Sequence, residues 1–228
     1  MRLFGASGNI PFSSFAMHGP FVHLVFSRRR KQVDKKRIAI EQPESCMVFD
    51  VSVGEDSVVL DRYLTDDLEK VVLPEEVYGK PVTEIGPGCF FNHPEITEVV
   101  FPETLTKIGE SAFALCKGLR NLLLPDSVSD IGVHAFRECT GLRKIVMPSS
   151  LKCMKVGIFS YCYLPDNVEI TLKEGLEKID HGVFFSSDVH LHFPLRLPES
   201  VSSIAEGAFE PGMKILTSLP YNEKWFEK

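Results

Sequence analysis

The apolar positions of this chain repeat with a period of 23 residues. The two clearest copies are TEVVFPETLTKIGESAFALCKGL, which begins at Thr97, and RNLLLPDSVSDIGVHAFRECTGL, which ends at Leu142. Apolar residues, a proline, a glycine, an Ala-Phe pair and a cysteine take the same places in both copies. A fixed period of about 20 to 50 residues is typical of stacked repeat proteins. The pattern therefore predicts a solenoid in which each unit covers the apolar side of the next.

One phenylalanine column extends the repeat over six units. Its members are 23, 23, 23, 25 and 25 residues apart: Phe90, Phe113, Phe136, Phe159, Phe184 and Phe209. The apolar run before each proline predicts a short parallel β-strand, because proline cannot donate a hydrogen bond to a sheet. A second short extended piece with a turn glycine follows, and then one helical turn around the Ala-Phe pair. Counterparts in successive coils should lie about 4.8 Å apart.

Four parts make up the predicted organisation. Residues 1–45 are expected to be a poorly ordered or linker-like extension, 46–67 an N-terminal capping hairpin, 68–213 the repeats, and 214–228 a C-terminal cap. The hairpin follows from apolar alternation over 47–53, a turn over 54–57 and renewed apolar character over 58–60. For the C-terminal part, one interpretation is a short helix that lays Trp225 or Phe226 over the last coil. The other is an array that continues further.

The repeat resembles the BspA-type leucine-rich repeat family, whose unit is similar to L-x-x-φ-x-φ-P-x-x-φ-x-x-I-G-x-x-A-F-x-x-C, with φ apolar. One unit fills every position: Leu119, Leu122, Leu124, Pro125, Val128, Ile131, Gly132, Ala135, Phe136 and Cys139. The resemblance covers about residues 47–220, with departures at Lys173, Asp180 and Ser187. It implies a right-handed α/β solenoid of a bacterial or protist protein, usually secreted or on the cell surface, that binds proteins or mediates adhesion. The family motif holds no catalytic residue.

Charge is unevenly distributed and narrows the choice of partner. Residues 1–45 carry 8 Lys/Arg and 3 Asp/Glu, whereas the remainder carries 17 and 28. An acidic body disfavours nucleic acid as a partner. The basic cluster within 28–37 is interpreted as a solvated linker or part of a misassigned start, and less favourably as a contact with nucleic acid or a membrane surface.

Targeting patterns give no firm compartment. The chain has no run of 18 apolar residues, so we expect no membrane insertion. Residues 1–26 lack the unbroken apolar stretch of a signal peptide. The family resemblance favours secretion or the cell surface, whereas this pattern favours a cytoplasmic protein or a different start.

Reactive side chains have plainer interpretations. Cys116, Cys139 and Cys162 share one repeat position, and we expect small buried groups in preference to metal ligands or disulfides. Ser160 and His181, with Cys162, could be assembled into a nucleophilic set, but no motif supports one.

A second candidate lies at Asp188, His190 and His192, which a strand would place on one face. A Zn²⁺ site there is less favoured than an exposed face, because no further ligand is in view. We therefore expect no enzyme, no metal and no cofactor.

The predicted binding surface is the outer face of the strands. It consists of the residue two positions before each proline position, with charged residues at its margin. The row is Val72, Val100, Leu123, Val146, Thr171 and Arg196, and the margin includes Glu98, Arg120, Arg143 and Lys144. An apolar centre with a charged rim is typical of a partner-binding patch, although β-branched residues also simply suit strands.

The preferred function is a non-enzymatic, monomeric interaction module for a protein or glycan ligand. The alternatives are a structural repeat without a dedicated ligand and, less favoured, a hydrolase or metalloenzyme.

Overall fold

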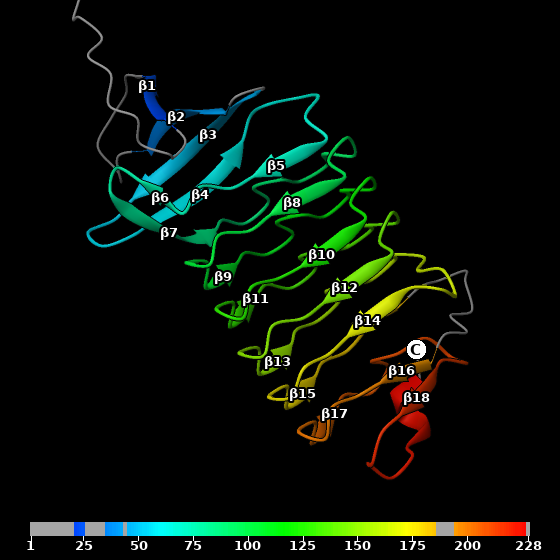
Figure 1. The fold of residues 1–228 in the computed structure, drawn as a ribbon. Coiled ribbons are helices and arrows are strands. Elements are labelled where there is room, and N and C mark those ends of the chain that lie inside the picture. Colours follow the sequence, from blue (N-terminus) through cyan, green and yellow to red (C-terminus); the bar gives the residue numbers. More distant parts are fainter. Residues whose placement is uncertain (1–20, 26–34, 43–44, 186–193, 227–228) are drawn as a thin grey trace, which may run out of the picture.

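The computed structural model describes residues 21–25, 35–42, 45–185 and 194–226. Successive coils stack along one axis and form an elongated β-solenoid of about six turns (Figure 1). Each coil contributes a first strand of three residues: β5 (Lys70–Val72), β8 (Glu98–Val100), β10 (Asn121–Leu123), β12 (Lys144–Val146), β14 (Glu169–Thr171), β16 (Pro194–Arg196) and β18 (Lys214–Leu216). β5 to β14 form one parallel sheet, and β16 pairs with β18 in another.

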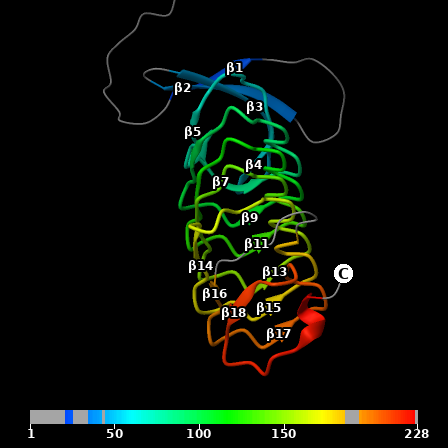
Figure 2. The same ribbon diagram turned by 90° about the vertical axis from the view of Figure 1, so that its right-hand side faces the viewer.

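A second side of the solenoid is formed by shorter strands. They are β7 (Lys80–Ile85), β9 (Lys107–Ile108), β11 (Asp130–Ile131), β13 (Cys153–Met154), β15 (Lys178–Ile179) and β17 (Ser203–Ile204). All of these pair in parallel with the next coil except across the step from β11 to β13, where the sheet is interrupted. When the molecule is turned by 90°, the coils appear as regular rungs (Figure 2).

The N-terminal strands extend this second sheet. They are β1 (Phe21–Val25), β2 (Lys35–Gln42), β3 (Ser45–Val53) and β4 (Val58–Tyr63), with β6 (Glu76–Val77) pairing with β7. β3 and β4 are antiparallel, as the predicted hairpin requires, and β4 joins β7 in parallel.

The linker-like assignment of 1–45 is wrong for residues 21–25 and 35–42, which form strands. Ile38 and Ile40 of β2 are fully buried, since they alternate onto the inner face. Lys35, Lys36 and Arg37 of the basic cluster therefore belong to a strand. Arg37 pairs with Asp50 at 2.9 Å, and 28–31 lie outside the described residues.

The phenylalanine column forms the centre of the core. Phe113 is stacked on Phe90 at 4.7 Å between ring centroids and on Phe136 at 5.5 Å. Phe159 and Phe184 continue the stack at spacings of 5.7 and 5.5 Å. The prediction that counterparts one period apart are neighbours in space is confirmed.

The segment around each Ala-Phe pair contains consecutive turns, whereas the sequence predicts one helical turn. The amide of Ala112 donates to the carbonyl of Gly109 in its own coil at 3.3 Å, while that of Phe113 donates to Ala135 in the next coil at 2.8 Å. Ser111 has a φ of 53°, which is incompatible with a right-handed helix. The helical prediction is wrong because alternate amides find their partners between coils.

The glycine after the second strand permits close packing of the coils. A Cβ built on Gly132 would lie 2.4 Å from the backbone nitrogen of Glu110 and 2.6 Å from the carbonyl carbon of Gly109. The backbone of one coil thus passes directly over that of the previous coil, where only a hydrogen atom fits. The glycine is needed for this approach and not for a positive φ.

The C-terminal segment forms a shortened seventh coil. After β18, the 3-10 helix η1 (Glu223–Phe226) places Phe226 at 6.1 Å from Phe209. The amide of Phe209 donates to the carbonyl of Trp225 at 3.0 Å, just as that of Phe184 donates to Ala208 at 3.2 Å. Phe226 thus takes the next place in the phenylalanine column.

Candidate binding surface

The first strands present a row of outward side chains along one face of the solenoid. Val100 and Leu123 are 41% and 51% exposed, whereas Val72 and Val146 are half-buried. Leu123 on β10 lies in register with Val146 on β12, and Val72 on β5 with Val100 on β8. Thr171 continues the register on β14. The apolar part of the face is thus narrow and centred on β8 and β10.

Two of the predicted marginal charges are occupied by ion pairs between adjacent strands. Glu98 pairs with Lys70 at 2.9 Å, and Lys144 pairs with Glu169 at 3.0 Å. These side chains are about half exposed, so each pair stabilises the stack by less than about 1 kcal/mol. Glu98 and Lys144 therefore act first as bridges between coils.

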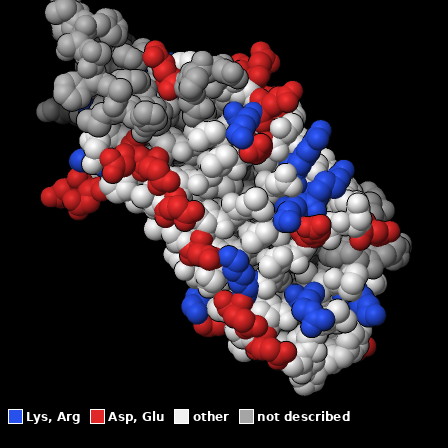
Figure 3. All heavy atoms as spheres, in the orientation of Figure 1, with Lys and Arg blue, Asp and Glu red and all other residues white. Residues whose placement is uncertain are grey.

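Arg120 and Arg143 are placed differently. They lead into β10 and β12, and the amide of Arg143 donates to the carbonyl of Arg120 at 2.8 Å. Together with Thr97, Lys117, Gly118 and Gly141 they line a surface hollow of about 350 Å³. Figure 3 shows Lys and Arg side chains gathered on this flank of the molecule.

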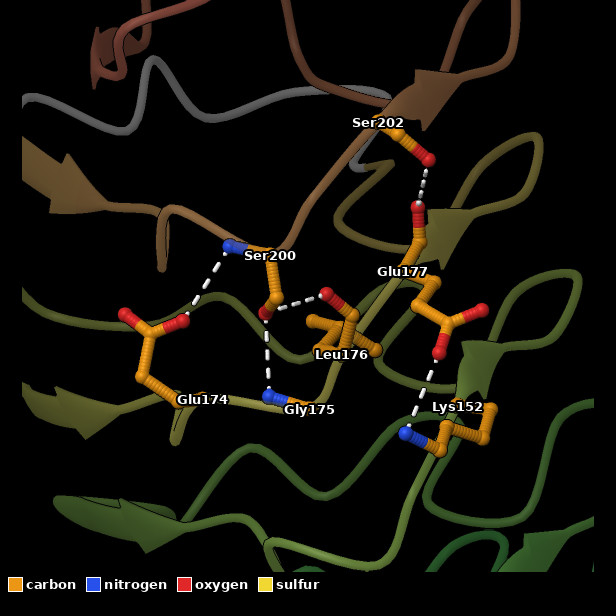
Figure 4. Close-up of polar contacts among 7 residues, drawn as sticks. All are labelled: Lys152, Glu174, Gly175, Leu176, Glu177, Ser200 and Ser202. Carbon is orange, nitrogen blue, oxygen red and sulfur yellow. Dashed lines mark hydrogen bonds and ion pairs between the residues drawn. The ribbon is translucent and has the colours of Figure 1, made fainter.

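At the opposite edge of the strand face, acidic side chains that the sequence did not indicate accept hydrogen bonds from the next coil. Glu174 follows β14 and accepts hydrogen bonds from the amides of Glu199 and Ser200 in the next coil, both at 3.1 Å (Figure 4). These bonds, from Glu199 first, lower the pKa of Glu174. The Ser200 hydroxyl donates to the carbonyl of Leu176 at 2.7 Å and accepts from the amide of Gly175.

Asp126 occupies the same place after β10 and explains one departure from the repeat. It accepts from the amide of Ser149 at 2.8 Å and pairs with Lys173 at 2.7 Å, which stands where proline is expected. The ammonium group and the amide lower the pKa of Asp126 to about 2. Lys173 thus replaces a strand stop with a contact that reaches across two coils.

The cysteine column is buried. The thiols of Cys116, Cys139 and Cys162 each donate to a phenylalanine carbonyl of the preceding coil at 3.1 Å. Burial raises the pKa of Cys116 and of Cys162 to about 12. All three are free thiols, as expected for small core groups.

The nucleophilic set considered from the sequence is not brought together. The buried Ser160 hydroxyl donates to the carbonyl of Gly157 at 2.9 Å, and His181 contacts the carbonyl of Glu206 instead. Asp188, His190 and His192 lie outside the described residues. Elsewhere, among residues that the structure describes, no three His, Cys, Asp or Glu side chains are arranged to hold a metal ion. In the same residues, no helix has the length and apolar character to cross a membrane.

Repeated coils of two short parallel strands and a turn ladder, built around a phenylalanine stack, define a β-solenoid of the leucine-rich repeat class. Residues 83–216, more than half of the chain, match the BspA type leucine rich repeat region in six copies. The chain belongs to this family. No curated protein matches it.

Solved structures support the same architecture. A leucine-rich repeat protein of T. pallidum is 28% identical with a TM-score of 0.61, and the match covers 75% of this chain and 80% of that one. A leucine-rich cell surface protein of Faecalibacterium prausnitzii A2-165 is 22% identical with a TM-score of 0.53, over 78% of this chain and 54% of that one. At this lower identity, the second similarity concerns the fold alone.

Proposed function

We propose that this chain is a non-enzymatic interaction module that binds a protein ligand on the strand face, centred on β8 and β10. The observation that carries the proposal is the exposure of Val100 and Leu123 beside each other, with charged residues at the margin. Isolated exposed apolar residues are ordinary, but a row rimmed by charge is typical of an interface. The fit to a leucine-rich repeat family supports a binding role in preference to catalysis.

Burial sharpens which residues should contribute. Leu123 and Val100 have the most side-chain area to bury on binding, whereas Val72 and Val146 are already half-buried. Each Å² of apolar side-chain area that a partner buries contributes roughly 25 cal/mol to the binding free energy, and a mutation that removes this area loses that contribution. We therefore assign the contact first to Leu123 and Val100, then to Val72 and Val146.

A surface or secreted setting is part of the proposal. The F. prausnitzii structure is described as a cell surface protein, and protein capture at a cell surface suits a rigid solenoid. Proteolysis of intact source cells, followed by immunodetection of the chain, tests this setting separately.

The experiment is site-specific photo-crosslinking in the native source. A benzophenone side chain at Val100 should trap a defined protein, and the combined variant with Leu123→Glu should lose that product. Val156, which is exposed at 37% away from the strand face, supplies the control: crosslinking there should give no such product, and Val156→Glu should not abolish trapping at Val100.

Two outcomes decide against the proposal. Equal products at Val100 and Val156 would mean that the strand face has no special role. No product at either position would favour a structural repeat without a dedicated ligand.

A further inference from the structure

Four ion pairs of the solenoid share one arrangement. Across neighbouring coils, opposite charges face each other: Lys70 with Glu98, Lys107 with Glu84, Lys144 with Glu169, and Lys152 with Glu177. Since coils repeat about every 4.8 Å, facing side chains are close enough for charge to matter. Opposite charges at facing positions stabilise the stack, whereas like charges destabilise it.

Arg120 and Arg143 differ from these four pairs, because two like charges occupy equivalent positions of neighbouring coils. Each is exposed, and the backbone bond between them at 2.8 Å places them at the same position of consecutive coils. Lys117, also exposed, lines the same hollow. Within the described part of the chain, none of these three cations forms an ion pair with a carboxylate.

Most side-chain donors of Arg120 and Arg143 form no hydrogen bond within the described part of the chain. Arg143 donates through Nη1 to the carbonyls of Leu142 and Thr140, at 2.8 and 3.3 Å. A guanidinium has five donors in a planar fork, and its geometry matches a carboxylate. The remaining N–H donors of Arg143 and those of Arg120 are therefore available to bind a ligand.

Gly118 and Gly141 make the hollow between these loops. A Cβ on Gly118 would lie 2.3 Å from the carbonyl oxygen of Pro94, and one on Gly141 2.4 Å from that of Lys117. The loops are therefore stacked as closely as the strands, which fixes the spacing of the two arginines. A hollow of about 350 Å³ lies at the lower end of the range for small-ligand sites and suits one or two side chains of a partner.

Resting on the function proposed above, we infer that the ligand is an acidic peptide segment, with Asp or Glu carboxylates in the Arg120–Arg143 hollow and an apolar side chain on Leu123. Leu123 is the last residue of β10, and Arg120 directly precedes that strand, so the two residues are about 10 Å apart along the extended backbone. An anionic sugar could satisfy the arginines, but its C–H faces offer less apolar area to Leu123 and Val100 than a large apolar side chain does. The surrounding body has a net negative charge, with 28 Asp/Glu and 17 Lys/Arg after residue 45, so the neighbouring Arg120 and Arg143 favour one orientation of an acidic segment.

The test is selection from a random displayed 12-residue peptide library on the folded chain, followed by affinity measurements with enriched peptides. Asp and Glu should be enriched together with large apolar residues. Arg120→Gln/Arg143→Gln should weaken the selected peptides at least tenfold. The control Lys152→Gln/Lys178→Gln makes the same change of net charge on the second side of the solenoid, at two exposed lysines that are held in ion pairs, and should leave the affinity within twofold. Wild-type affinity should fall as salt rises.

The outcomes separate this inference from the proposed function. Loss of affinity in Val100→Gln/Leu123→Glu, with none in Arg120→Gln/Arg143→Gln, keeps the strand face and overturns the acidic ligand. No effect of either pair overturns both. Selected peptides without acidic enrichment, an empty selection, or binding of a sulfated oligosaccharide where no acidic peptide binds would each overturn the inference.

Discussion

Replacing Phe136 by alanine should remove the central contact of the phenylalanine column. Phe136 is fully buried between Phe113 at 5.5 Å and Phe159 at 5.7 Å. Truncation of a buried phenylalanine costs about 3–5 kcal/mol, and lost ring stacking belongs to that sum. Because a typical domain is stable by only about 5–15 kcal/mol, the variant should be folded but strongly destabilised. Phe136→Leu, which keeps most of the volume, should lose roughly half as much or less.

The same change should uncouple the two ends of the solenoid, since each coil contacts only its neighbours. Trp225, the single tryptophan, is buried in the last coil, so its fluorescence reports the C-terminal end while far-UV circular dichroism reports all coils. In urea, the two transitions should coincide for the wild type and separate for Phe136→Ala. If Phe136→Ala lowers the free energy of unfolding by less than about 1 kcal/mol and its fluorescence and circular-dichroism transitions still coincide, the phenylalanine column does not couple the coils.

Two further predictions concern positions where coils touch. Gly132→Ala places a methyl group against the backbone of Glu110 and Gly109, so urea unfolding should show a free energy of unfolding lower by about 1–3 kcal/mol or more. Gly54→Ala is the control, because the nearest atom to a Cβ at Gly54 would be 3.2 Å away. If Gly132→Ala lowers the stability no more than Gly54→Ala does, the close approach of the coils at Gly132 is contradicted. At pH 8, a thiol reagent should modify the exposed Cys46 quickly and leave Cys116 and Cys162 unmodified until urea unfolds the chain. The reason is that burial raises the pKa of these two thiols to about 12 and keeps them protonated. If mass spectrometry shows fast modification of all three cysteines in the native state, the cysteine column is accessible to solvent and the reasoning is wrong.

The stack of coils could be predicted because one sequence period maps onto one turn of the solenoid. Phe113 and Phe136 recur with their neighbours at fixed offsets, and only a parallel stack places all of these residues in equivalent, buried positions. The ends of the first strands could also be predicted, because proline has no backbone N–H to donate to a neighbouring strand. These features depend on residues within one unit.

Features that depend on contacts between coils were not predictable in this way. The Ala-Phe segments favour a helical interpretation, but their alternate amides bond to the next coil, as the Phe113–Ala135 bond shows. The role of Gly132 is likewise set by the coil beneath it. In β2, the charges around Ile38 and Ile40 obscured the alternation of a buried strand.

The candidate surface was predictable in outline only. Alternation along a strand indicates which side chains point outward, but the exposed area depends on neighbouring coils, so Leu123 is exposed while Val146 is half-buried. The sequence also gives no means of separating marginal charges by their partners. Lys144 is held by Glu169, whereas Arg120 faces Arg143, and this contrast distinguishes a bridge from a binding group.

The seventh coil shows which property of the repeat matters physically. Phe226 follows Phe209 after 17 residues, where earlier steps are 23 or 25, so a search by period misses it. Its coil nevertheless supplies a strand that pairs with β16 and a carbonyl, from Trp225, for the amide of Phe209. The period is thus a consequence of the usual coil length, whereas the inter-coil hydrogen bond and the aromatic stack are what each coil must provide. Shortening the loop between them is tolerated because that loop forms neither contact, and the same reasoning explains how the two 25-residue steps fit into a stack of 23-residue coils.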